Sequence, residues 1–544
     1  MSSAADLLFA GGAVFGVSPD HRVPSAVAVR AGRVLAVGTD AEALRGPATE
    51  VVDLGGGLLV PGFQDAHVHP VQGGLERLGC DLSELGTRAD YVAAISGYAE
   101  ANPRLDWITG GGWSLTAFPG GTPSRGDLDR VVPDRPVFLA NSAHHGAWVN
   151  SVALELAGIN AATPDPPDGR IEREPDGAPS GTLHEGAMAL VGRLAPVPTP
   201  EDYRAALLEA QAYLHSLGIT AWQDAILGDY ANIGDVGPAY LEAARSGALT
   251  ARVVGALWWE RDRGAEQIPD LVARRSALSA GRFRATSVKI MQDGVPENFT
   301  AGMLEPYFDG CGCRTADRGL SFVDPLALRE HVTALTRADF QVHVHAIGDR
   351  AVREALDAFE AARSAGSGRD LRHHIAHLQV VHPDDVGRFA GLGVTATIQP
   401  LWAAFEPQMV ELTIPFLGEE RTGWQYPFAG LLRGGARLAG GSDWPVTSPD
   451  PIAGIHVAVN RRLPAEPDAA RFLSEQSLSL AEALTAYTAG SAFVNHLDDT
   501  GRIAEGFRAD LAVLDRNPFA DDPEEIGDVR VVATYVDGEL VFSR

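Results

Sequence analysis

Short apolar runs separated by turn residues occur at both ends of the chain. Near the start they lie at 7–9, 27–29, 34–37 and 51–52. Near the end they lie at 511–514, 531–536 and 540–542. Asp537-Gly538 joins the last two runs and is typical of a hairpin turn. Because packing both sets together buries both apolar faces, we expect a small β-sandwich formed by residues 1–60 and 486–544.

Between these ends, helix-like segments alternate with apolar, strand-like runs. A helical pattern at 203–217 precedes a strand-like run at 219–222, and one at 326–338 precedes a run at 340–345. Repeated units of this kind give a parallel sheet, so we expect an α/β fold with a (β/α)8 barrel of the TIM type over 61–485. A Pro/Gly-rich stretch around 127–186 breaks the alternation and is predicted to be an insertion over the catalytic face.

Composition narrows the class of protein. The chain has 544 residues and a formal net charge of -27, which argues against nucleic acid and against an anionic membrane surface as partners. No apolar run is long enough to span a bilayer. The three cysteines, Cys80, Cys311 and Cys313, make a poor disulfide framework, so a reducing cytoplasmic location is expected. The sequence leaves the oligomeric state open, with a homodimer as one option.

The sharpest local signal is Asp65-Ala66-His67-Val68-His69, which follows an apolar run at 58–60. Residues two apart on a strand project to the same side, so His67 and His69 are candidates to face one cation at the strand's carboxyl end. Histidines on a strand are also ordinary core or surface residues, and this alternative stays open.

Lys289 lies inside a second apolar run and is followed by Asp293-Gly294. A buried ammonium group is costly unless it is paired or chemically altered. One resolution is carbamylation, which makes a carboxylate able to bridge two cations. The alternative is that Lys289 reaches solvent or pairs with Asp293.

The run 340–345 carries His343 and His345 on one face. Because barrel chemistry occurs at strand carboxyl ends, His345 is the better ligand candidate and His343 is expected one layer deeper, as a hydrogen-bonded packing residue. The stretch 371–382 holds four more histidines, of which one or two are expected to point into the barrel. These are His373, His374, His377 and His382.

Asp443 follows an apolar run and two glycines. A carboxylate there is suited to holding a metal and taking a proton from bound water, although a helix N-cap or an Asx-turn is the alternative. The order of the whole set, His-x-His, Lys, His, His and Asp at strand ends, favours a metallohydrolase, because a purely structural barrel does not need these groups there.

These residues resemble the amidohydrolase superfamily, and more closely the branch called amidohydrolase family 3, which includes enzymes similar to N-substituted formamide deformylase. The resemblance spans essentially the whole chain. Its motifs are Pro61-Gly62-Phe63 with Asp65-Ala66-His67-Val68-His69, Gly111-Gly112-Trp113, Pro136-Val137-Phe138-Leu139, His145 with Trp148-Val149-Asn150, Gly181-Thr182-Leu183 with Glu185, Val288-Lys289 with Asp293-Gly294, His345-Ala346-Ile347-Gly348-Asp349, His377, and Gly441-Ser442-Asp443-Trp444-Pro445. The chain departs from the pattern at Ala376, where relatives often carry an acidic residue.

The resemblance implies a divalent-metal site, with zinc as the expected ion and one or two ions bound. It implies His67 and His69 on one cation, His345 and His377 on the other, and a carbamate derived from CO2 on Lys289 as the bridge. Asp443 would contact the metal and act as general base and then acid, while metal-activated water cleaves an amide or N-formyl C–N bond of a small organic substrate.

The resemblance also implies that Trp113, His145 and Glu185 lie near the substrate. Each has a structural alternative, namely a packed indole, a capped loop histidine and a helix N-terminal glutamate. Two further functions stay open. One is a cyclic-amide hydrolase or deaminase of the same superfamily, which would use the same site on another electrophile. The other is a barrel without catalysis that serves as a binding protein.

Overall fold

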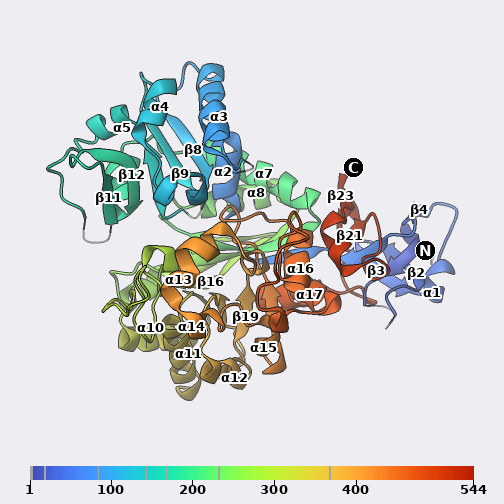
Figure 1. The fold of residues 1–544 in the computed structure, drawn as a ribbon. Coiled ribbons are helices and arrows are strands. Elements are labelled where there is room, and N and C mark those ends of the chain that lie inside the picture. The colour runs from blue at the N-terminus through green and yellow to red at the C-terminus, as the bar shows by residue number, and fades with distance from the viewer. Residues whose placement is uncertain are drawn as a thin grey trace.

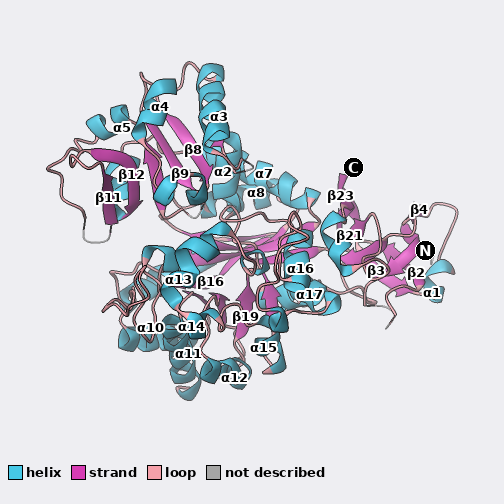
Figure 2. Ribbon diagram, viewed as in Figure 1, coloured by secondary structure: helices cyan, strands magenta, loops and turns pink. Residues whose placement is uncertain are grey.

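The computed structural model describes residues 4–16, 20–83, 85–142, 144–166, 169–230, 233–366 and 369–544. Three sheets organise these residues (Figures 1 and 2). The largest is the barrel, the second is built by an insertion after its first strand, and the third joins both ends of the chain. Among the described residues, no helix is long and apolar enough to cross a membrane.

Eight parallel strands form the barrel wall, and the expected α/β barrel is confirmed. They are β6 (Phe63–Val68), β13 (Ile219–Leu227), β14 (Arg252–Trp258), β16 (Phe283–Met291), β17 (Gln341–Ala346), β18 (His374–His377), β19 (Thr395–Ile398) and β20 (Leu438–Gly440). A short strand, β15 (Ser279–Ala280), pairs antiparallel with β16. The first and last strands meet where the backbone N–H of Asp443 donates to the carbonyl of His67, at 2.8 Å.

Helices follow most of the barrel strands. They are α2 (Pro70–Leu78), α7 (Pro200–Ser216), α8 (Gly237–Ser246), α9 (Ile268–Ala277), α10 (Pro325–Arg337), α11 (Asp349–Ser364), α12 (Pro383–Leu392), α13 (Ile414–Leu417), α14 (Glu419–Thr422), α15 (Phe428–Arg433), α16 (Pro451–Asn460), α17 (Leu480–Thr485) and α18 (Ser491–Val494). Local sequence fixes their starts. Thr199 and Asp202 form a capping box at α7, and the Asp324 carboxylate caps α10 ahead of Pro325.

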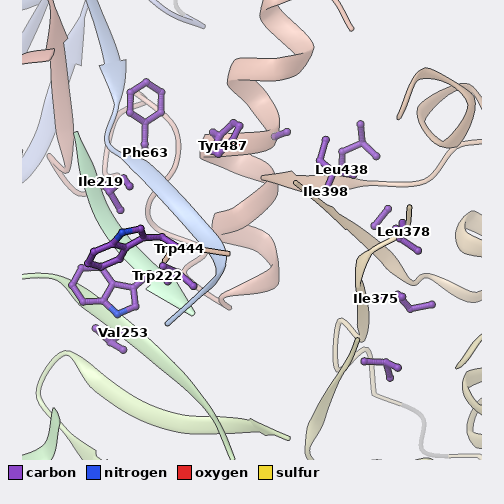
Figure 3. Close-up of a cluster of buried hydrophobic side chains, with 14 of the residues drawn as sticks. Phe63, Ile219, Trp222, Val253, Ile375, Leu378, Ile398, Leu438, Trp444 and Tyr487 are labelled. Carbon is purple, nitrogen blue, oxygen red and sulfur yellow. The ribbon is translucent and has the colours of Figure 1, made fainter. Parts of the chain in front are cut away.

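The barrel core explains the apolar runs of the sequence. On β17, Val342 and Val344 belong to one continuous core cluster, while the histidines between them point the other way, into the barrel. Figure 3 shows part of this cluster, with Phe63 of β6, Trp222 of β13 and Ile375 of β18. Burying each such side chain contributes about 1.5–3 kcal/mol. The core therefore makes a rigid frame for the strand ends.

The insertion forms a six-stranded sheet in the order β11-β12-β10-β9-β8-β7. Its strands are β7 (Cys80–Asp81), β8 (Ile108–Trp113), β9 (Val137–Asn141), β10 (Gly146–Val149), β11 (Gly169–Arg173) and β12 (Pro179–Glu185). Its helices are α3 (Arg88–Ala101), α4 (Arg125–Val131), α5 (Ser151–Leu156) and α6 (Ala189–Gly192). The sheet thus begins well before 127, the start expected for the insertion, because β7 and β8 already pair with each other there.

Strands from both chain ends join in one sheet, as Figure 1 shows at the end where N and C lie. The strands are β1 (Leu7–Val14), β2 (Pro24–Arg30), β3 (Arg33–Val37), β4 (Glu50–Asp53), β5 (Leu58–Pro61), β21 (Leu511–Leu514), β22 (Val531–Val536) and β23 (Glu539–Ser543), with the short helix α1 (Thr39–Glu42). β5 and β21 pair antiparallel and connect the two ends. The pairing gives one continuous sheet, so the sandwich of two packed sheets, like the exact domain boundaries, stays a prediction.

Candidate metal centre

His67, His69 and Asp443 meet at the carboxyl end of the first barrel strand. β6 ends at Val68 and Pro70 starts α2, so His69 lies at the junction. Oδ1 of Asp443 lies 3.0 Å from Nε2 of His67 and 3.1 Å from Nε2 of His69. The carboxylate therefore contacts imidazoles and caps none of the described helices, so the alternative of a helix N-cap is wrong.

Asp65 lies behind this group and fixes it. Its carboxylate accepts from the Ser442 hydroxyl at 2.6 Å and from the backbone N–H of His67 at 2.9 Å. Burial raises the pKa of Asp65 to about 7, although these hydrogen bonds oppose the shift. Asp65 thereby ties the loop that carries Asp443 to β6.

The charges at the centre follow from burial and proximity. Burial opposes ionisation of Asp443, but the imidazoles of His67, His69 and His377 outweigh it and hold the pKa of that carboxyl well below its usual range. Burial, with Lys289 nearby, lowers the pKa of His67 to about 3. An ionised carboxylate beside the neutral imidazole of His67 is the protonation state that binds a cation.

Lys289 lies on β16, and its amine points to the same place. Nζ lies 3.4 Å from Nε2 of His67, and the side chain is buried. Burial lowers the pKa of Lys289 to about 7, although Asp443 opposes the shift. In the described part of the chain Asp293 contacts His345 and not Lys289, so the proposed Lys289–Asp293 pair is wrong.

His345 is the last residue but one of β17 and His377 ends β18, and their ring centroids lie 4.4 Å apart. The ring of His377 also lies 4.6 Å from that of His67 and stacks on Trp402. Both ring nitrogens of His377 are buried and have no hydrogen-bond partner among the described residues. Because each unsatisfied buried group costs about 1–3 kcal/mol, this ring needs a further partner.

These residues fit a divalent cation. The donor atoms of His67, His69 and Asp443 lie within 4.8 Å of one another, and a nitrogen and oxygen donor set of this kind suits zinc. His345 and the unpartnered His377 stand beside that group, and Lys289 lies close to His67. All of them occupy strand carboxyl ends, where barrel enzymes carry their chemistry.

The other histidines of β17 and of the stretch 371–382 have structural roles. Nε2 of His343 lies 2.8 Å from Nδ1 of His67, one layer deeper in the barrel, as expected. His374 bonds to Gln223 and Thr397 in the same deep layer. His373 stacks on Phe359 outside the barrel, and His382 caps α12. Two of the four histidines at 373–382 therefore point into the barrel, within the number expected.

A cavity of about 350 Å³ opens over this group. Besides the centre, residues of three kinds line it: polar groups of the insertion, aromatic residues, and groups on the loops after β16 and β19. They include Ser114, Thr116, Ser142, His144, His145, Tyr230, Trp258, Glu297, Trp402, Glu406 and Tyr426. The volume suits a small organic molecule.

The three residues expected near substrate differ in their positions. His145 lines the cavity, and its Nδ1 lies 3.0 Å from the carboxylate of Glu185. Burial opposes protonation of His145, but Glu185 outweighs it and raises the pKa of the ring. Trp113 does not lie where it was expected, near the substrate. It is fully buried, packs against Phe118, and donates its indole N–H to the Leu139 carbonyl. It is a packing residue of the insertion.

Some groups at the site were not singled out from the sequence. Asp65, which holds His67, was quoted only as part of a motif, and Asp293, which holds His345, was considered only as a partner of Lys289. His144 lies against Gln72 and Glu76 on the cavity wall, and Glu297, Glu406 and Tyr426 come from loops. The sequence could have indicated the first two, because Asp65 lies two residues before His67 and Asp293 four residues after Lys289. Nothing in the sequence around the loop residues indicates that they line the cavity.

A parallel barrel with imidazoles, a buried lysine and a carboxylate at its strand carboxyl ends defines a metal-dependent hydrolase. The model of the amidohydrolase family matches residues 50–542, and the chain belongs to that family. It is 32% identical to the protein LONG AFTER FAR-RED 3 of Arabidopsis thaliana, covering 99% of this chain and 92% of that protein. It is 28% identical to N-substituted formamide deformylase of Arthrobacter pascens, covering 100% and 99%.

The fold is also shared with solved structures. An uncharacterized metal-dependent hydrolase from Pyrococcus furiosus superposes with a TM-score of 0.70 at 28% identity, over 94% of this chain and 99% of that one. The printed names of these relatives differ in kind, so the comparisons define a hydrolase of the amidohydrolase family without defining its substrate.

Proposed function

We propose that this protein hydrolyses a linear amide or N-formyl C–N bond of a small organic substrate. The observation that carries the proposal is the convergence of His67, His69 and His377 on the ionised Asp443, while neither ring nitrogen of His377 has a hydrogen-bond partner among the described residues. A packed core gains nothing from such a group, whereas a hydrolytic site needs it.

His67 and His69 would hold one divalent cation, His345 and His377 a second, with a carbamate on Lys289 between them and Asp443 at the first. When bound, a divalent cation supplies a Lewis acid that polarises a carbonyl and lowers the pKa of water toward about 7. The low pKa of Lys289 supports the carbamate, because only the neutral amine reacts with CO2.

Asp443 would move the proton. Its carboxylate accepts a proton from water as the water oxygen bonds to the carbonyl carbon, and then donates it to the leaving nitrogen as the C–N bond breaks. His145 lines the same cavity, and because Glu185 holds its Nδ1, Nε2 is left to contact the substrate.

A substrate screen tests this proposal. The protein, reconstituted with zinc and bicarbonate, is assayed on N-formylamines, linear amides, cyclic amides and heterocycles with an exocyclic amine. We expect hydrolysis of the first two classes and a loss of about 10²–10⁴-fold in Asp443→Asn. Exposed Asp262 provides the matched control, Asp262→Asn, which should keep full activity. Turnover of only the last two classes, or full activity in Asp443→Asn, would overturn the proposal.

A further inference from the structure

Two carboxylates line the cavity and form no ion pair with any described residue. Glu297 lies in the short helix Pro296–Asn298 after β16, and Glu406 lies in the loop after β19. Glu297 accepts a hydrogen bond from the Thr413 hydroxyl at 2.6 Å. Within the described ranges, the Glu406 carboxylate forms neither a hydrogen bond nor an ion pair.

Among the described residues, neither carboxylate forms an ion pair; the ring of His145, whose pKa Glu297 helps to raise, is held by Glu185. The described residues that line the cavity include no arginine, and Lys289 lies beside His67. Burial raises the pKa of Glu406 to about 7, and the negative charges of Glu466 and Glu297 add to the shift. The two carboxylates therefore repel each other and are stabilised by any positive group placed between them.

Tyr426 supplies an independent sign of a ligand at the same place. Tyr426 is only 2% exposed, yet it lines the cavity, and its hydroxyl forms no hydrogen bond with the described residues. Glu297 and Glu406 act on it electrostatically. Arg461 lies behind this ring but bonds to the backbone carbonyls of Phe472 and Tyr426, so it pairs with neither carboxylate.

The chemistry of these three groups matches one kind of ligand. A primary ammonium group carries a positive charge and three N–H donors, and the wall offers two carboxylates and a phenol oxygen as acceptors. The ring of Trp402, four residues before Glu406, lines the same cavity and stacks on His377. A substrate with a carboxylate there would meet only repulsion.

We propose that Glu297, Glu406 and Tyr426 bind a protonated amine of the substrate, away from the scissile bond. The enzyme therefore prefers amides that carry a primary ammonium group. The expected substrate preference rests on the proposed function, whereas the expected binding of the cation does not.

Two pairs of compounds test the inference on the zinc-loaded protein, and each pair holds one cationic and one uncharged member. The substrate pair is N-(5-aminopentyl)formamide and N-hexylformamide, in which a methyl replaces the ammonium. The binding pair is hexylammonium and 1-hexanol, followed by calorimetry. We expect kcat/KM and affinity to favour the cationic member by about tenfold or more, as for one charge-assisted hydrogen bond.

Substitution assigns the effect to the wall. Glu406→Gln and Glu297→Gln remove charge while keeping size, and each should bring both preferences close to one. Glu411 is exposed in the neighbouring segment Met409–Thr413, so Glu411→Gln, which loses the same charge, should keep them.

The hydrolysis and binding measurements together distinguish failure of this inference from failure of the proposed function. Hydrolysis without any preference for the ammonium, and without tighter hexylammonium binding, overturns the inference and leaves the proposed function standing. Tighter hexylammonium binding that Glu406→Gln abolishes, in a protein that cleaves neither formamide, supports the cation site while the proposed function fails. A preference that survives both substitutions places the amine elsewhere and overturns the inference.

Discussion

Asp293 holds His345 in one orientation: its Oδ1 lies 3.1 Å from Nδ1 of the ring. The same carboxylate accepts the backbone N–H groups of Gly302, Ile347 and Gly348 at 2.8–3.0 Å. A carboxylate with this many donors is an acceptor, so Nδ1 of His345 carries the proton and Nε2 is left for a cation. The loop after β16 thus sets the tautomer of a side chain on β17.

Asp293→Asn should therefore weaken metal binding more than it unfolds the protein. An amide nitrogen cannot accept from His345 or from backbone N–H groups, so we expect a loss of about 10–100-fold in metal affinity. Competition with a chromogenic chelator measures it, with Asp262→Asn as the control. An unchanged affinity in Asp293→Asn would show that His345 needs no such support.

Lys289 should take up CO2. Burial lowers its pKa to about 7, which leaves a large neutral fraction near neutral pH. In protein equilibrated with ¹³C-bicarbonate and zinc, we expect one slowly exchanging carbamate carbon signal by NMR. Lys289→Arg keeps a positive charge but forms no carbamate, so the signal should vanish together with most of the activity. Full activity in Lys289→Arg would contradict the bridging role.

Trp113→Phe should lower stability rather than substrate affinity. The indole N–H donates to the Leu139 carbonyl at 2.8 Å inside a fully buried cluster, and losing that bond costs about 1–3 kcal/mol. Urea unfolding measures the loss, and KM should stay within about twofold because the ring does not reach the cavity. A raised KM at unchanged stability would restore Trp113 as a substrate contact.

Asp537 should make stability depend on pH. Burial opposes its ionisation, but Arg252, Arg508 and Arg282 outweigh it and lower its pKa below 3.8 in the folded protein. A lowered folded pKa contributes stability that is complete above 3.8 and is lost as pH falls through the folded value. The urea midpoint of wild type should exceed that of Asp537→Asn at neutral pH, and the gap should shrink below 3.8. A constant gap would contradict this.

How much the sequence predicts depends on which force places a residue. His67, Lys289 and His345 lie on strands, where alternation decides which side faces the barrel, so their convergence follows from periodicity. Asp443 follows the last strand closely enough for the same argument.

Side chains outside the barrel strands were harder to place. Trp113 ends a strand of the insertion, and nothing local shows whether its ring turns to the cavity or to Phe118. Glu406 and Tyr426 come from separate loops that only tertiary packing brings to one wall. The insertion sheet starts at β7, before its expected range. The sequence did not indicate this start, because a two-residue strand leaves almost no periodic signal.

The metal content of the purified protein tests the central claim most directly. Elemental analysis after reconstitution with zinc and bicarbonate should give at least one ion per chain in wild type. His331→Ala, which alters a histidine on α10 outside the centre, should keep that content, and the His67→Ala/His69→Ala double variant should lose it. Wild-type protein without stoichiometric metal, or a double variant that keeps its metal, would contradict the account.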